Sequence, residues 1–139
     1  MSLGGMLRAG WILGIAIIVA GIALAAAYSQ MWVVEKGDVA EGLKLFTGER
    51  RFANGGPPCI NCHSISSLGI RGGVLGPDLS RAFKSGKYVD FSGDEEKLRR
   101  YLSNPTTPVM SVIWGRRPLT QEEISSLIKL LVYASEKAG

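Results

Sequence analysis

The organisation of this chain is decided by one short stretch, Cys59-Ile60-Asn61-Cys62-His63. The C-x-x-C-H pattern is typical of covalent haem attachment, in which two thiols bond the porphyrin and the adjoining imidazole binds its iron. Thiols three positions apart lie on one face of a helical turn, and the following residue is then directed at the metal. We therefore predict one covalently bound haem c, with Cys59 and Cys62 as attachment sites and His63 as an iron ligand.

Other interpretations of the same residues are weaker. A structural zinc site needs four nitrogen or sulfur ligands, and the chain contains only two cysteines and one histidine. A thioredoxin-like redox pair would need alternating strands and helices around it, which the sequence does not predict. A structural disulfide could use both thiols, but it would leave the position of His63 unexplained.

The amino-terminal part is dominated by an apolar run from Trp11 to Tyr28 that contains no charged residue. As a helix these 18 residues would be about 27 Å long, close to the hydrocarbon thickness of a bilayer. A cleaved signal peptide is the alternative, and the three alanines before Tyr28 would suit a peptidase, but its apolar core is usually shorter. We expect an uncleaved membrane anchor over residues 1–34 and a separate domain over residues 35–139.

The rest of the chain is divided into short helices by glycine and proline. Asp38 and Glu41 predict the start of a first helix, and a later helix is predicted over residues 94–102. Thr120, with Glu123 as its capping partner, predicts the start of a last helix with a strong apolar stripe. Because no pair of strands is indicated, the predicted fold class is all-α, with a single transmembrane helix before the domain.

This order of elements resembles the class I fold of monohaem c-type cytochromes over residues 38–136. The stretch around Gly42 is similar to the amino-terminal helix of that family, in which a glycine permits close crossing with the terminal helix. Residues 119–124 are similar to the start of that terminal helix. The sequence departs from the family at Leu130, near the place where an aromatic residue is usual.

The resemblance implies two further site residues. Pro77 lies in a stretch similar to the family's loop in which a proline carbonyl accepts a hydrogen bond from the ligating imidazole, which would orient His63. Met110 is the only methionine beyond the apolar run, and it lies in a proline-bounded loop where the family has its methionine ligand. Ser111 follows it where proline is commoner in the family, so a lysine ligand or an open iron site remains an alternative.

Iron with both axial positions filled has no open site for a substrate. We therefore expect an electron carrier between respiratory or photosynthetic redox partners, not an enzyme, with neither a small-molecule substrate nor a nucleic acid as partner. If the sixth position were open, a gas-binding haem sensor would be the alternative. Basic doublets such as Arg50-Arg51 and Arg116-Arg117 could steer an acidic partner, although most such doublets are ordinary surface.

The predicted anchor implies a location and a kind of partner. Arg8 precedes the apolar run and favours a cytoplasmic amino terminus. The resemblance to bacterial c-type cytochromes implies that haem is attached on the outer side of the cytoplasmic membrane. We therefore expect a single-pass protein with its haem domain on the periplasmic or exterior side. The layout resembles the small haem c subunit of bacterial nitric oxide reductases and other anchored respiratory cytochromes, and Gly10 with Gly14 would suit contact with other transmembrane subunits.

Overall fold

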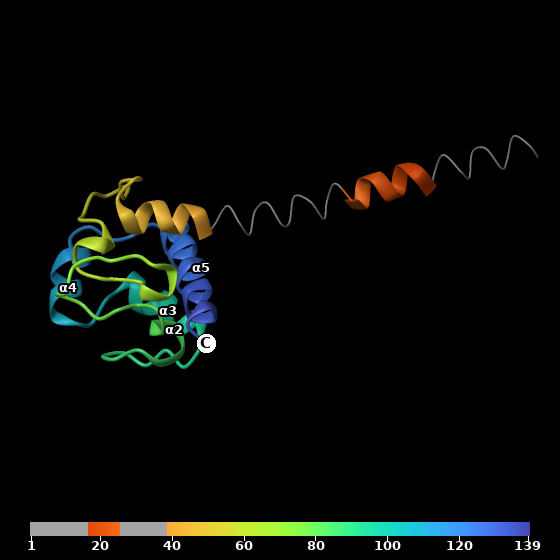
Figure 1. Cartoon of the computed structure of the whole chain (residues 1–139). Helices are drawn as coiled ribbons and strands as arrows, with labels where there is room; N and C mark the ends of the chain where they lie inside the picture. Colours follow the sequence, from red (N-terminus) through yellow and green to blue (C-terminus); the bar gives the residue numbers. More distant parts are fainter. Residues whose placement is uncertain (1–16, 26–38) are drawn as a thin grey trace, which may run out of the picture. The chain divides into compact units, whose positions relative to one another are not determined.

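The structure is a computed structural model that describes residues 17–25 and 39–139. The chain divides into two compact units, Met1–Lys36 and Gly37–Gly139. In the first unit the described residues form a single helix over residues 17–25, drawn in red in Figure 1. Asp38, which was predicted to begin the next helix, lies outside the described residues.

The predicted transmembrane helix is corrected by the structure. Among residues 17–25 and 39–139, no helix is both long enough and apolar enough to cross a bilayer. The prediction of a single-pass protein of the cytoplasmic membrane is overturned with it, and Trp11 and Tyr28, on which it relied, lie outside the described residues.

The second unit is built from short helices joined by turns (Figure 1). A helix over residues 39–47 comes first. The elements that follow are the 3-10 helices η1 (Cys59–Asn61) and η2 (Ser66–Leu68) and the α-helices α2 (Ala82–Ser85), α3 (Glu95–Ser103), α4 (Pro108–Gly115) and α5 (Gln121–Lys137). Within residues 39–139 the only β-type pairing is an isolated bridge between Ile65 and Ile70, so this part of the chain is helical.

Local sequence explains where the helices α3 and α5 begin. The Asp94 side chain caps α3 by accepting hydrogen bonds from the amides of Glu96 and Lys97. At the start of α5, Thr120 and Glu123 form a reciprocal capping box, which confirms the predicted helix start.

The helix α5 is the centre of the core. It packs against α2, α3 and η2, and the apolar stripe predicted for this helix is buried, with Ile124, Leu127, Ile128 and Leu131 among its residues. The helix over residues 39–47 crosses it at Gly42, where an added Cβ would lie 2.9 Å from the carbonyl carbon of Ser126 and 3.0 Å from the Cβ of Leu130. The close crossing predicted at this glycine is therefore confirmed, and a fully buried Leu130 fills the place of the usual aromatic residue.

Candidate cofactor site

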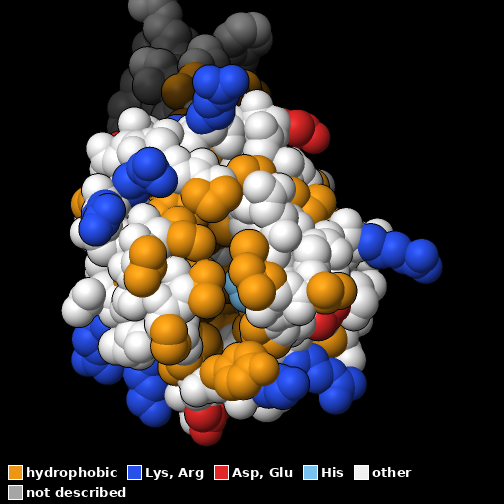
Figure 2. All heavy atoms as spheres, turned by 90° about the vertical axis from the view of Figure 1, so that its left-hand side faces the viewer, with side chains coloured by type: hydrophobic (Ala, Val, Ile, Leu, Met, Phe, Trp, Pro, Cys, Tyr) orange, Lys and Arg blue, Asp and Glu red, His pale blue; other side chains and the backbone are white. Residues whose placement is uncertain are grey.

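All five predicted site residues line one cavity of about 370 Å³ in the second unit; they are Cys59, Cys62, His63, Pro77 and Met110. This volume lies within the range of pockets that hold cofactors and other small molecules, about 300–1,000 Å³. In Figure 2 the histidine, pale blue, is visible at the bottom of a hollow whose edge is formed mainly by apolar side chains. Among the described residues that line the cavity, the charged ones are Asp78 and Lys87.

The two cysteines are brought to the cavity by a single helical turn. Two amides donate to the carbonyl of Cys59 in this turn, that of Cys62 at 3.1 Å and that of His63 at 2.9 Å. Both cysteines are free thiols, and burial raises the pKa of Cys59 to about 12. Cys59 is therefore a neutral thiol at physiological pH, as suits a group that faces apolar surroundings.

The imidazole of His63 is held by the main chain of a distant loop. Its Nδ1 lies 2.8 Å from the carbonyl oxygen of Pro77, the hydrogen bond that the resemblance implied. Because a carbonyl can only accept, Nδ1 carries the proton and donates it. This tautomer leaves the lone pair of Nε2 for a metal, and the carbonyl makes that nitrogen a more basic ligand.

The loop that carries Pro77 is fastened to the cysteine motif by its backbone. The amides of Gly73, Gly76 and Leu79 each donate at 2.8 Å to a carbonyl of residues 60–64. A Cβ at Gly76 would lie within 2.8 Å of three atoms of the His63 ring, so only glycine fits at this position. The resemblance placed Pro77 in a loop beside His63, but it did not indicate that Gly76 packs against the imidazole, because the sequence does not tell which atoms lie beside a glycine.

Asp78 holds the next part of the same loop, and the sequence analysis missed it. Its carboxylate accepts hydrogen bonds from the amides of Ser66 at 3.0 Å and Ser80 at 2.8 Å. Burial raises the pKa of Asp78, but the hydrogen bonds from Ser80 and Ser66 outweigh this effect and hold it below its usual value. The charged carboxylate thus fixes the residue directly after Pro77, and with it the carbonyl that meets His63. The only sequence signal was an Asp two positions before a Ser, a common turn pattern.

Met110 lies on a helix, not in the predicted loop. It is the third residue of α4, which begins at Pro108 because proline is well suited to the first turn of a helix, and no glycine or proline follows until Gly115. Met110 is half-buried and lines the cavity, as does Trp114 one turn further along the same face of α4. At the other end of the helix, the hydroxyls of Tyr101 and Thr107 are 2.7 Å apart and share a hydrogen bond.

The residues present fit a covalently bound haem. Two thiols, an imidazole with a free Nε2 and a thioether face one apolar space of suitable volume. Cys59 and Cys62 would hold the porphyrin, while His63 and Met110 would bind its iron. The walls of the space would exclude water, since most of the other lining residues are apolar or aromatic.

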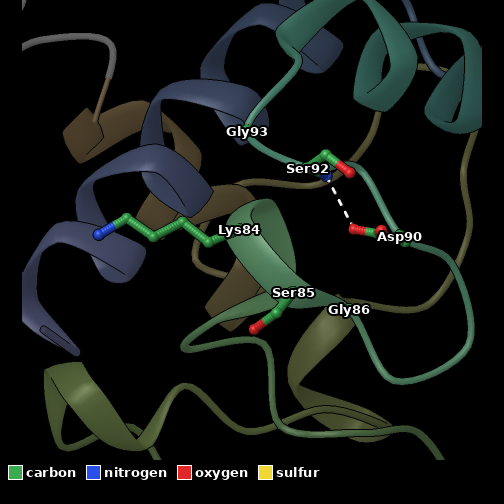
Figure 3. Close-up of a pocket in the computed structure, with 6 residues that line it drawn as sticks. All are labelled: Lys84, Ser85, Gly86, Asp90, Ser92 and Gly93. Atoms are coloured by element: carbon green, nitrogen blue, oxygen red, sulfur yellow. Dashed lines mark hydrogen bonds between the residues drawn. The ribbon is translucent and has the colours of Figure 1, made fainter.

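A second hollow, lined by polar residues, lies beside α2 (Figure 3). The Asp90 carboxylate in it accepts a hydrogen bond from the amide of Ser92 at 2.9 Å, and the Lys84 side chain extends away from this pair. In the described part of the chain no group of three or more histidine, cysteine or acidic residues is placed to hold a metal ion. This hollow therefore has none of the thiol, imidazole or thioether groups that line the first cavity.

No protein-family model, curated protein or solved structure matches this chain. The functional argument therefore depends on the geometry of the cavity and on the residues that line it.

Proposed function

We propose that this protein is a monohaem c-type cytochrome that carries single electrons between redox partner proteins. The observation that carries the proposal is that Cys59, Cys62, His63 and Met110, from two distant parts of the chain, line the same apolar cavity. A haem bound there would supply a one-electron couple between ferrous and ferric iron. With both axial positions occupied by protein ligands, we expect electron transfer without turnover of a substrate.

The chain's own residues would set the properties of this couple. The Pro77 carbonyl orients His63 and raises the basicity of its Nε2, which stabilises the ferric state. The thioether of Met110 is a soft ligand that favours ferrous iron and raises the reduction potential. Apolar walls act in the same direction as the thioether, because a medium of low dielectric constant disfavours the additional positive charge of ferric iron.

Several of the exposed apolar residues of the domain lie at the mouth of the cavity. Leu75, Tyr88 and Val109 line it and are 69%, 68% and 47% exposed. Val74 adjoins Leu75 and is 97% exposed, and Val112 follows Val109 by one turn of α4. Such a concentration is typical of an interaction surface, and it supports docking of a redox partner over this mouth.

Basic side chains surround this mouth. On the face shown in Figure 2, Lys and Arg side chains lie around the apolar area, with few acidic side chains among them. Arg116 and Arg117 are exposed, whereas Arg50 is paired with Glu41 at 2.8 Å. An acidic contact surface on the partner would complement this charge, and the association rate should then fall as salt increases.

The test is production of the chain in a bacterium that has a cytochrome c maturation system. Haem that survives denaturing electrophoresis and acidic acetone is expected for the native protein, because the thioether bonds are covalent. A double variant, Cys59→Ala with Cys62→Ala, is the matched control and should retain no haem under these denaturing conditions. Native protein that releases its haem into acidic acetone would contradict the proposal, and rapid carbon monoxide binding would favour a haem sensor instead.

A further inference from the structure

We infer that Glu123 is a positioning residue for Met110: its carboxylate ties the segment that leads into the cysteine motif to the segment that follows α4. This inference rests on the proposed function and assigns to Glu123 a role in keeping the thioether on the iron. Glu123 touches neither the cavity nor the predicted ligands, so it would act through the two segments that it joins.

The two oxygens of this carboxylate bind different parts of the chain. Oε2 accepts a hydrogen bond from the amide of Thr120 at 2.8 Å, which is the local half of the capping box. Oε1 accepts one from the amide of Ala53 at 2.7 Å, across 70 positions of the sequence. Glu123 is 2% exposed, and a buried carboxylate is tolerated only where hydrogen bonds compensate for its lost hydration. Both oxygens must therefore keep these hydrogen bonds for the carboxylate to stay buried.

Two further contacts join the same segments. The side-chain amide of Asn54 donates to the carbonyl of Pro118 at 2.7 Å. The rings of Phe52 and Trp114 pack edge to face, with centroids 4.8 Å apart and planes at 76°. The backbone at Gly56 also lies against Trp114, since an added Cβ there would be 2.9 Å from the indole. We call this set of contacts between residues 52–56 and residues 114–123 the clasp.

The clasp holds the carboxy-terminal end of the helix that bears Met110. Trp114 is one turn after Met110 on the same face of α4, and both line the cavity. Residues 52–56 continue through two prolines, whose fixed φ angles stiffen the connection, directly into Cys59. The contacts of the clasp thus determine how far the helix of Met110 lies from the motif that contains the cysteines and His63.

Replacing Glu123 by Gln keeps the shape of the side chain and removes one of its two acceptors. The NH₂ group of Gln would face a backbone N–H, and one of the two amides would lose its partner. The haem would stay attached through the thioether bonds, and His63 would keep its own hydrogen bond to Pro77. The expected consequence is selective loss of Met110 from the iron.

The experiment follows the weak band at the red end of the ferric spectrum, which reports iron–thioether bonding, during an alkaline titration. Loss of one buried hydrogen bond should make the fraction of molecules in which Met110 has left the iron about tenfold larger. In the Glu123→Gln protein the midpoint pH for loss of this band should therefore fall by about one unit. Carbon monoxide should bind the ferrous variant about tenfold faster for the same reason.

Two variants separate positioning from general loss of stability. Asp94→Asn weakens another acidic cap that accepts two amide hydrogen bonds, but both of these lie within α3. Thr120→Ala removes the hydroxyl that caps the Glu123 amide and keeps the carboxylate bridge. Both variants should unfold at lower urea concentrations while keeping the native band midpoint. Equal midpoints for Glu123→Gln and these controls would overturn the inference.

A milder variant is available if Glu123→Gln does not fold. Asn54 is exposed, and Asn54→Ala removes only its bond to Pro118, so a smaller shift of the midpoint in the same direction is expected. An unshifted midpoint in Asn54→Ala would then refute the clasp. Failure of the proposed function would be distinguished at once, because the native protein itself would lack covalent haem or the red-end band.

Discussion

The two sides of the cavity are built in different ways. On the His63 side, a glycine-rich loop is fastened to the cysteine motif by a series of main-chain hydrogen bonds, and the imidazole itself is hydrogen-bonded. On the Met110 side, the short helix α4 presents exposed Val109 and Val112 to solvent and is held at its ends, by the bond between Tyr101 and Thr107 and by the clasp.

This difference suggests different mobilities for the two axial ligands. Main-chain hydrogen bonds distributed along a loop require many groups to separate together, so the position of His63 should be difficult to change. A helix held at its two ends can move away once one end is released. We therefore expect that Met110 exchanges on the iron while His63 does not, and the predictions below test this contrast.

The largest effect is expected from Gly76→Ala, on the His63 side. The new Cβ would overlap the imidazole, which cannot move aside because Pro77 holds it, so the free energy of unfolding should fall by about 2–3 kcal/mol. Urea denaturation of the haem-loaded protein measures this loss. Gly115→Ala is the control, since a Cβ there meets open space, and it should cost almost nothing. Equal stabilities for the two variants would refute the close packing on the ring.

On the other side, Met110→Ala should leave the fold intact and change the redox couple. Loss of the soft sulfur favours ferric iron, so the reduction potential should fall by on the order of 100 mV, and the red-end band should disappear. Carbon monoxide should then bind the ferrous protein readily. Redox titration of this variant is compared with Val112→Ala, which alters an exposed neighbour on the same helix. An unchanged potential in Met110→Ala would mean that the sixth ligand is another residue.

A smaller effect on the His63 side is expected from Asp78→Asn. Because the hydrogen bonds from Ser80 and Ser66 hold the pKa of Asp78 below its unfolded value, its contribution is present above the unfolded value and is lost as the pH falls through the folded one. The variant should therefore be about 0.5–1 kcal/mol less stable than the native protein at pH 7. The difference should vanish in strong acid, well below pH 3.8. Urea midpoints across this range measure it, and a difference independent of pH would contradict the assignment.

The smallest effect should come from Pro77→Ala. The acceptor for His63 is the main-chain carbonyl of residue 77, which alanine retains. Only the stiffness of the loop is lost, which costs about 0.4–1 kcal/mol through the unfolded chain. Because this cost lies in the unfolded chain, the potential of the folded protein should change little, by at most about 20–40 mV even if all of that energy acted on the one-electron couple. A fall as large as that of Met110→Ala would show that proline itself positions the carbonyl.

Much of the local architecture could be predicted from the sequence, because it depends on residues close together in the chain. The capping box of Thr120 and Glu123 is an example, as is the helix predicted over residues 94–102 and found at Glu95–Ser103. The helix of Met110 was missed because Pro105 and Pro108 were interpreted as the bounds of a loop, although Pro108 begins a helix. The transmembrane prediction was wrong, since no helix within residues 17–25 and 39–139 is both long enough and apolar enough to cross a bilayer.

What the sequence determined by itself is the set of chemical groups and their local spacing: two thiols and an imidazole on one turn, one methionine near the last helix, and a cap at its start. What only the tertiary structure decided is which distant groups meet. Three contacts show this: the Gly76 backbone lies against the imidazole, the Asp78 carboxylate accepts from the Ser66 amide, and the Glu123 carboxylate accepts from the Ala53 amide. Each joins residues that are far apart in the sequence. Such contacts form only when the core brings the segments together, and no local pattern of residue types specifies them.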